Sequence, residues 1–283
     1  MNKTSKTLDD MLKEVDYKKY EKGYIPSKES IEFINFIKLV NGASGEENTS
    51  PLFHYDIVDT IMRFDNVLVV SFRGSAKSSL VEYLALYLGV YGHLPRFGSV
   101  EVGMYVGDTM ENGGKNFRTN VEHRYNNSDF LKKYIPTTRF TDTEIELKNV
   151  SGHSICFRIY GANTGVRGFK KYGIRPQIAF LDDLMSDKSA ESKTITKDIE
   201  NVIYKAVRQA MHPTKRKVLW IGTPFNKNDP LYKAAGSKGW TTNVFPICEE
   251  FPCTKDEFRG AWIDRFPYSQ VRRHLIYLEI TVR

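Results

Sequence analysis

Residues 67–79 read Val-Leu-Val-Val-Ser-Phe-Arg-Gly-Ser-Ala-Lys-Ser-Ser, and this stretch decides the fold. Its first four residues form an apolar, mostly β-branched run, which predicts a buried strand over Val67–Val70. Small residues follow, and a helix is expected over 78–89. A strand that passes through a small-residue loop into a helix presents backbone N–H groups to an anion. The stretch is therefore a candidate phosphate-binding loop.

The loop departs from the standard phosphate-binding motif, GxxxxGK[ST]. Aligned on Lys77 and Ser78, it has Ser71 and Ala76 at the two glycine positions. In a nucleotide site Lys77 would contact the β- and γ-phosphates, and Ser78 would bind Mg²⁺. An ordinary strand-to-helix turn with an exposed lysine is the alternative. The candidate phosphate-binding residues are Ser71, Arg73, Gly74, Ser75, Ala76, Lys77, Ser78 and Ser79.

A second apolar run, Ile178–Leu181, ends in Asp182 and Asp183. This is the pattern of a Walker B element, in which an acid at the end of a buried strand holds Mg²⁺. Asp182 is the expected metal partner. Asp183 stands where many ATPases have a glutamate that orients the attacking water. The alternative is a helix N-cap, because aspartate favours that position.

A third apolar run, residues 217–221, leads into Gly222-Thr223-Pro224. A hydroxyl at the end of a neighbouring strand is placed to sense the γ-phosphate, so Thr223 is a candidate coupling residue. A plain turn before the proline is the alternative. The following residues, Asn226-Lys227-Asn228-Asp229, match the NKxD pattern that reads guanine, but so short a polar pattern arises easily by chance.

Helices and strands alternate along most of the chain. Strands are expected at 67–70, 102–106, 178–181 and 217–221, with a hairpin at 144–160. A further strand is expected at 244–247, where Pro246 would confine it to the edge of the sheet. Helices are expected at 29–40, 53–64, 78–89, 111–124, 129–134 and 196–211. This alternation predicts an α/β fold with a mostly parallel sheet covered by helices on both faces, preceded by an N-terminal helical segment.

Composition narrows the class of protein. The chain has 283 residues and a formal net charge of +7, which suits a polyanionic partner such as DNA. Basic stretches at 132–133, 167–171 and 215–217 are either DNA contacts or solvated surface. The first residues lack the apolar core expected of a signal peptide, and no apolar run is long enough to span a membrane. Its three cysteines form no CxxC pair, so neither a disulfide framework nor a zinc site is indicated.

Four segments together resemble the large subunit of the terminases of tailed bacteriophages. These are Arg73–Ser78, Gly165–Gly168 with the following Arg175-Pro176 and Phe180–Asp183, then Ile221–Pro224, and finally Trp262–Phe266. The first resembles the arginine-containing, glycine-poor phosphate loop of the family, and the third resembles its coupling motif. The resemblance extends from about Phe53 to Phe266.

The resemblance implies a RecA-like P-loop ATPase with an additional strand, which uses ATP and Mg²⁺ to pump double-stranded DNA into an empty capsid. It implies that the partners are the portal protein, the terminase small subunit and further copies of the chain in a ring, in the cytoplasm of the host cell. The family carries a C-terminal nuclease, but only residues 267–283 follow the ATPase region. We therefore expect residues 1–50 to form a helical arm, residues 51–266 to form the ATPase domain, and the chain to have no nuclease activity.

Residue by residue, the resemblance implies that Lys77 and Ser78 bind phosphate and metal and that Asp182 serves the metal. It also implies that Asp183 orients water and that Thr223 couples hydrolysis to motion. His54 and Tyr55 stand where the family often has an adenine-binding segment. Two arginines are candidates for stabilising the transferring phosphoryl group, Arg73 within the same subunit and Arg167 from a neighbouring one. The alternative functions are another DNA-dependent P-loop ATPase and a DNA-binding assembly protein that does not hydrolyse nucleotide.

Overall fold

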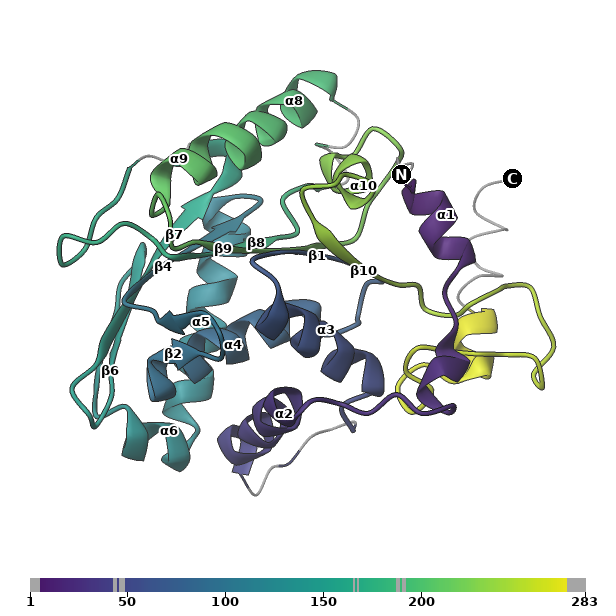
Figure 1. The fold of residues 1–283 in the computed structure, drawn as a ribbon, viewed down its shortest axis with the longest axis horizontal. Helices are drawn as coiled ribbons and strands as arrows, with labels where there is room; N and C mark the ends of the chain where they lie inside the picture. Colours follow the sequence, from purple (N-terminus) through teal and green to yellow (C-terminus); the bar gives the residue numbers. More distant parts are fainter. Residues whose placement is uncertain are drawn as a thin grey trace.

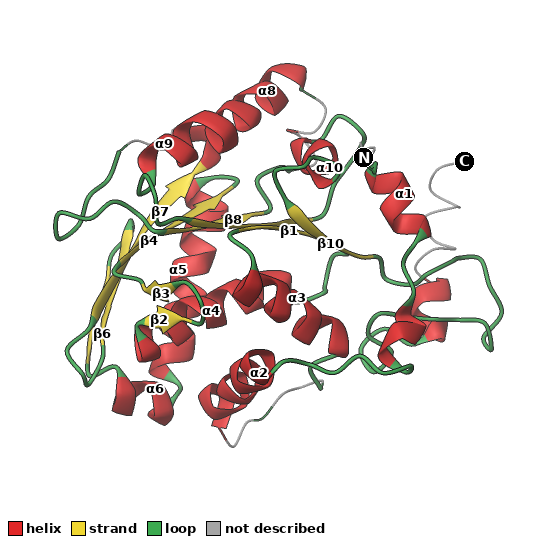
Figure 2. Ribbon diagram, in the orientation of Figure 1, coloured by secondary structure: helices red, strands yellow, loops and turns green. Residues whose placement is uncertain are grey.

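A computed structural model describes residues 6–42, 45, 49–164, 166, 168–186, 189 and 192–273. An eight-stranded sheet runs through the middle of the molecule, and helices lie on both of its faces (Figures 1 and 2). None of the helices in these ranges is long and apolar enough to cross a membrane.

The strand order confirms the expected fold. Along the sheet the strands are β10 (Thr241–Phe245), β1 (Asn66–Ser71), β9 (Lys217–Gly222), β8 (Ile178–Asp182), β4 (Val102–Gly107), β7 (Ser154–Gly161), β6 (Glu144–Lys148) and β5 (Thr137–Phe140). All neighbours from β10 to β7 pair in parallel, and β6 pairs antiparallel with both of its neighbours, β7 and β5. Strand β9 lies between β1 and β8, so the sheet contains the additional strand that gives this fold class its name.

Helices cover the sheet in two layers (Figure 1). One face carries α2 (Lys28–Asn41), α3 (Leu52–Arg63), α4 (Lys77–Tyr91), α5 (Lys115–Asn126) and α6 (Asp129–Tyr134). The other face carries α1 (Leu8–Lys13), α8 (Lys193–Asn201), α9 (Arg208–Ala210) and α10 (Pro230–Ala235). A separate hydrophobic core fills the space under each layer. A short ribbon of β2 (His93–Leu94) and β3 (Gly98–Ser99) follows α4.

Burial explains why these segments adopt these structures. The side chains of β4, β8 and β9 are buried on both faces, as the uninterrupted apolar runs of a covered parallel sheet require. Helix α4 is buried almost all round, so it is apolar on every side rather than amphipathic. It packs between the sheet and the outer helices, and its first residue is Lys77.

Three details of the secondary structure differ from the expectation. The helix expected at 196–211 is interrupted by a π-helical segment, Val202–Val207. The last strand ends at Phe245, because Pro246 cannot donate to a neighbouring strand. Strand β5 was not expected; two of its residues, Thr137 and Arg139, are exposed, so it lacks a long apolar run.

The exposed position expected for Lys217 is also wrong. This lysine is buried at the start of β9, and its ammonium donates hydrogen bonds to the carbonyls of Ile61 and Phe64 at the end of α3. It therefore ties the helix to the sheet and is not available to DNA.

The N-terminal segment packs against the rest of the molecule. Tyr24 and Ser27, just before α2, both donate side-chain hydrogen bonds to Asp59 in the middle of α3. A short 3-10 helix, Tyr17–Tyr20, lies further upstream, and the Tyr17 hydroxyl donates to the carbonyl of Pro246 after β10. The arm thus bridges α3 and the C-terminal part of the chain.

Replacing Gly103 of β4 with alanine should destabilise the fold. A Cβ at this position would lie 2.4 Å from Phe157 Cε1 and 3.0 Å from Ile178 Cγ2, both in a fully buried layer. Overpacking of this kind lowers the free energy of unfolding by about 1–3 kcal/mol, measurable by urea denaturation. Gly239→Ala is the control, because its nearest neighbour is Ser237 Oγ at 3.9 Å. Equal stability of the two variants would contradict the packing argument.

Candidate nucleotide-binding site

Three loops meet at one edge of the sheet because three parallel strands end there. In the register of the sheet, Val70 pairs with Gly222 and Asp182 pairs with Ile221. The segments that follow β1, β8 and β9 therefore start side by side. This brings together the phosphate loop, the aspartate pair and Thr223, which are distant in the sequence.

The phosphate loop has two residues in the left-handed region. Gly74 has φ of 86° and Ala76 has φ of 60°, and α4 begins at the next residue, Lys77. Glycine adopts this region freely, whereas alanine pays a steric penalty there. The alanine at the second glycine position of the motif therefore has a backbone conformation that glycine adopts freely, in spite of its Cβ.

Two candidate side chains at the start of α4, those of Lys77 and Ser78, face the aspartate pair. The ammonium of Lys77 lies 3.2 Å from Asp183 Oδ2, although the lysine is only 6% exposed. The hydroxyl of Ser78 donates to Asp182 Oδ1 at 3.0 Å. The hydroxyl of Tyr105 on β4 donates to the other oxygen, Asp182 Oδ2, at 3.1 Å.

Burial makes Asp182 unusual. Loss of solvent and, next, the neighbouring carboxylate of Asp183 raise its pKa from 3.8 to about 7, although Ser78, Lys77 and Tyr105 act in the opposite direction. With a pKa this high, the carboxyl group is partly protonated near pH 7. A bound divalent cation would stabilise its ionised form. A serine hydroxyl next to a carboxylate oxygen is also the oxygen-only donor set that Mg²⁺ prefers.

Asp183 and Thr223 are joined to each other and to the phosphate loop. Asp183 has φ of 39°, a strained value for a residue with a side chain. Its Oδ1 accepts a hydrogen bond from the Thr223 N–H at 3.1 Å. The Thr223 hydroxyl donates to the carbonyl of Ser71 at 2.6 Å, where the phosphate loop begins. A movement of either segment would therefore change the hydrogen bonds of the other.

Two cavities meet the first turn of α4. The outer cavity has a volume of about 380 Å³ and is lined by His54, Ala76, Ser79, Leu80, Trp262 and Arg265, among others. The acidic cavity, of similar volume, is lined by Ser78, Glu82, Tyr105, Asn116, Asp182 and Asp183, among others. Consecutive residues Ser78 and Ser79 thus line different cavities.

The loop also has hydroxyl groups that suit an anion. The side-chain oxygens of Ser71 and Ser75 are buried and have no hydrogen-bond partner among the described residues. Buried hydroxyls normally find a partner, and a phosphate oxygen would accept from them. The residues present therefore fit a nucleotide phosphate.

The two residues proposed to contact adenine differ in position. His54 is buried and lines the outer cavity, and its Nε2 lies 2.7 Å from the carbonyl oxygen of Ser75. Tyr55 packs, partly buried, against the hydrophobic core on the same face of the sheet. Their role in adenine binding stays a prediction.

The structure describes only one of the two candidate arginines. Arg73 is exposed at the edge of the loop, and its guanidinium carbon lies 5.1 Å from the centre of the Phe225 ring, just beyond Thr223. Arg167 lies outside the described residues.

The NKxD sequence has a structural role. The carboxylate of Asp229, 2% exposed, accepts from the N–H groups of Leu231 and Phe225 and caps α10. An aspartate occupied in this way explains the pattern without guanine.

Sequence reasoning missed a polar network on α4 and α5. The carboxylate of Glu82, buried on α4, pairs with the guanidinium of Arg124 at 2.8 Å and accepts from Asn120 at 2.7 Å. Tyr105 was missed as well; its ring stacks on Phe117 of α5 with centroids 4.0 Å apart. Helix α5 thus contacts the residues around both cavities. The spacing of Asn116, Asn120 and Arg124 at every fourth position was the available signal.

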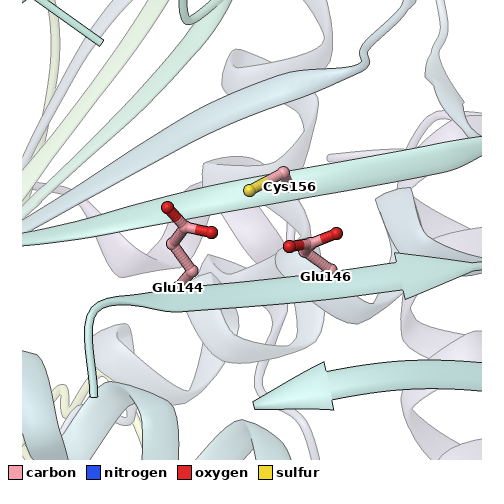
Figure 3. Close-up of side chains that lie close together, drawn as sticks. All are labelled: Glu144, Glu146 and Cys156. Atoms are coloured by element: carbon pink, nitrogen blue, oxygen red, sulfur yellow. The ribbon is translucent and has the colours of Figure 1, made fainter. Parts of the chain in front are cut away.

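A second group of acidic residues lies away from this site, on β6 and β7. Glu144, Glu146 and Cys156 point toward one another (Figure 3). Arg158 binds Glu144 at 2.7 Å, and Lys171 binds both glutamates. Burial raises the pKa of the Cys156 thiol to about 12. The group is therefore explained as an ion-pair cluster that anchors the segment around Lys171.

The strand order gives the chain a RecA-like α/β fold with an additional strand. Among solved structures, it resembles an arginine-to-alanine variant of the large terminase ATPase domain of Thermus phage P74-26. The TM-score is 0.54 at 12% sequence identity, over 90% of this chain and 92% of that one.

The chain also resembles the large terminase of bacteriophage HK97, with a TM-score of 0.55 at 14% identity. That match covers 81% of this chain and 46% of the HK97 protein, so this chain spans about half of its length. No protein-family model matches the sequence, and no curated protein sequence does. At such identities the likeness shows the fold: this chain has the fold of phage large-terminase ATPase domains.

The Asp182→Asn variant should differ from wild type in how its stability depends on pH. The folded pKa of Asp182 is about 7, against 3.8 ordinarily, so its stabilising contribution is present at low pH and is lost as pH rises through 7. The variant lacks this loss. Its free energy of unfolding, relative to wild type, should rise by about 2 kcal/mol between about pH 5 and pH 8. Urea unfolding in EDTA measures the difference; a constant value across this range would contradict the assignment.

Proposed function

We propose that this chain is the ATP-hydrolysing motor domain of a phage terminase large subunit, which drives double-stranded DNA into a preformed capsid in the host cytoplasm. One observation carries the proposal. At the carboxyl ends of β1, β8 and β9, a lysine, a serine, two aspartates and a threonine form a compact cluster of one ion pair and several hydrogen bonds. The terminase-like fold supports the choice of this ATPase over others.

The cluster suggests a role for each residue. The loop backbone and Lys77 would bind the phosphates of ATP, while Ser78 and Asp182 would hold Mg²⁺. When bound, Mg²⁺ supplies positive charge that neutralises the phosphate oxygens. Asp183 would accept a hydrogen bond from the water that attacks the γ-phosphorus, as the bond from that phosphorus to the leaving oxygen of ADP breaks. Because Lys77 pairs with Asp183 in this structure, the phosphates would compete for the lysine and release the carboxylate.

Thr223 would carry the state of the nucleotide to the rest of the domain. It donates through its hydroxyl to the phosphate loop and through its backbone to Asp183. Loss of the γ-phosphate would alter both contacts at once. We propose Arg73, next to Phe225 in the segment after Thr223, as a contact to the same nucleotide, and Arg167 as a contact to the nucleotide of a neighbouring subunit.

The proposal includes partners outside the site. A net charge of +7 favours contact with DNA phosphates, which is non-specific and weakens with salt. The portal protein, the terminase small subunit and other copies in a ring follow from the terminase assignment. The division into an arm at 1–50, an ATPase domain at 51–266 and a tail at 267–283 also stays a prediction.

ATP hydrolysis by the chain, with and without DNA and portal, tests the proposal. Lys77→Ala should reduce turnover on the order of a hundredfold or more, because Lys77 is the buried cation at the phosphate loop. Lys28→Ala is the matched control, since that side chain is 84% exposed on α2 and should leave turnover unchanged. Absence of turnover in wild type under every condition would support a non-hydrolysing assembly protein instead.

Mixing inactive subunits tests the role of Arg167. Arg167→Ala and Lys77→Ala should each lose on the order of a hundredfold or more of activity alone. On assembled motors with DNA, a mixture should recover activity well above either variant, because each Lys77→Ala subunit still offers Arg167 to its neighbour. A mixture of Lys77→Ala with Asp183→Asn is the control and should not recover, since both act on their own nucleotide. Equal, negligible activity of the two mixtures would show that Arg167 does not act between subunits.

A further inference from the structure

We propose that His54 is a positioning residue for the phosphate loop: it fixes the peptide between Ser75 and Ala76 so that the Ala76 N–H is aimed at phosphate. This inference rests on the proposed nucleotide site and gives its alanine-containing loop a physical explanation. It differs from the adenine contact that the sequence suggested for His54.

The position of His54 allows it to hold the loop. The residue lies in the first turn of α3 and is 3% exposed. Its Nε2 is 2.7 Å from the carbonyl oxygen of Ser75. The ring is packed edge-on against Phe53 and Trp262, with centroids 4.4 Å and 5.0 Å away. The two aromatic rings also contact each other, with centroids 6.3 Å apart, and together they restrict the orientation of His54, so the hydrogen bond has a defined direction.

The hydrogen bond between His54 and Ser75 shows which ring nitrogen of the histidine carries the hydrogen. A backbone carbonyl only accepts hydrogen bonds, so Nε2 must carry the hydrogen. Burial lowers the pKa of His54 to about 4, with a smaller opposing effect from the Ser75 carbonyl. The imidazole is therefore neutral at physiological pH, with its hydrogen on the nitrogen that faces the loop.

Peptide geometry converts this contact into a constraint on the next residue. In a trans peptide the C=O and the following N–H point in opposite directions. When the Ser75 carbonyl points toward α3, the Ala76 N–H must point away from it. On its other side, the carbonyl of Ala76 accepts from the Leu80 N–H at 3.1 Å, the first hydrogen bond of α4. Both peptides that flank Ala76 are thus held.

These two anchors explain the φ of 60° at Ala76. A left-handed alanine is disfavoured unless its surroundings determine it. With glycine at this position, as in the standard motif, the conformation would need no such support. The hydrogen bond from His54 substitutes for the missing glycine.

Binding measurements on variants test the inference. His54→Phe keeps the ring but removes the donor, and it should weaken binding of both MgATP and Mg-tripolyphosphate by a similar factor, about three- to tenfold. Adding Ala76→Gly to this variant should restore most of the affinity, because glycine adopts positive φ without cost. Ala76→Gly alone keeps the backbone N–H and is the reference with which the double variant is compared. Isothermal titration calorimetry gives the affinities, and thermal unfolding shows that each variant is folded.

Several results would overturn the inference. A loss restricted to ATP, with tripolyphosphate unaffected, would make His54 a base contact. Unchanged binding of both ligands would leave it a packing residue. If His54→Phe does not fold, the comparison of the double variant with Ala76→Gly decides: affinities within about twofold support the inference, and a tenfold loss in the double variant contradicts it. Wild type that binds MgATP without hydrolysing it would refute the proposed motor but not the role of His54.

Discussion

The parallel pairing of β9 between β1 and β8 is the constraint on which the rest of the structure depends. Because the three strands run in the same direction, the chain leaves the sheet three times at one edge. The residues that follow each strand therefore lie close together, although they are far apart in the sequence. The hydrogen bonds from Ser78 to Asp182 and from Thr223 to Ser71 exist only because of this register.

The same edge concentrates an electrostatic cost. Burial and, next, the adjacent carboxylate of Asp183 raise the pKa of Asp182, and the single buried ammonium of Lys77 only partly opposes them. A protein built for stability alone would not place a second acid there. Such a cost is typical of sites where the missing charge is supplied by a ligand, and stability and activity then oppose each other. The strained φ of Asp183 belongs to the same pattern.

Parts of the chain outside the motif support the loop. Helix α3 supplies His54 beneath the loop, and Trp262 near the C-terminal end packs against that histidine. Helix α5 stacks Phe117 on Tyr105 and binds Glu82 through Asn120 and Arg124. The aromatic contact and the polar network both line the cavities at the first turn of α4. A phosphate loop with few glycines depends on contacts from neighbouring elements more than a glycine-rich loop does.

By itself the sequence determined the class of fold, because fully covered parallel strands must be continuous apolar runs and because each run here ends in a residue with a recognisable chemical use. For this reason the sequence predicted the strands at Val67–Val70, Ile178–Leu181 and 217–221. It also predicted the polar residues that follow the second and third of these strands, which are Asp182, Asp183 and Thr223. Tertiary structure alone decided what surrounds them. Tyr105 sits in an apolar run where nothing marks its hydroxyl, and whether Lys217 is exposed depends on the distant end of α3. The backbone of residues 67–79 is the clearest case. Their sequence predicts a phosphate loop, but whether Ala76 can adopt a left-handed backbone conformation depends on contacts from residues that are remote in the sequence.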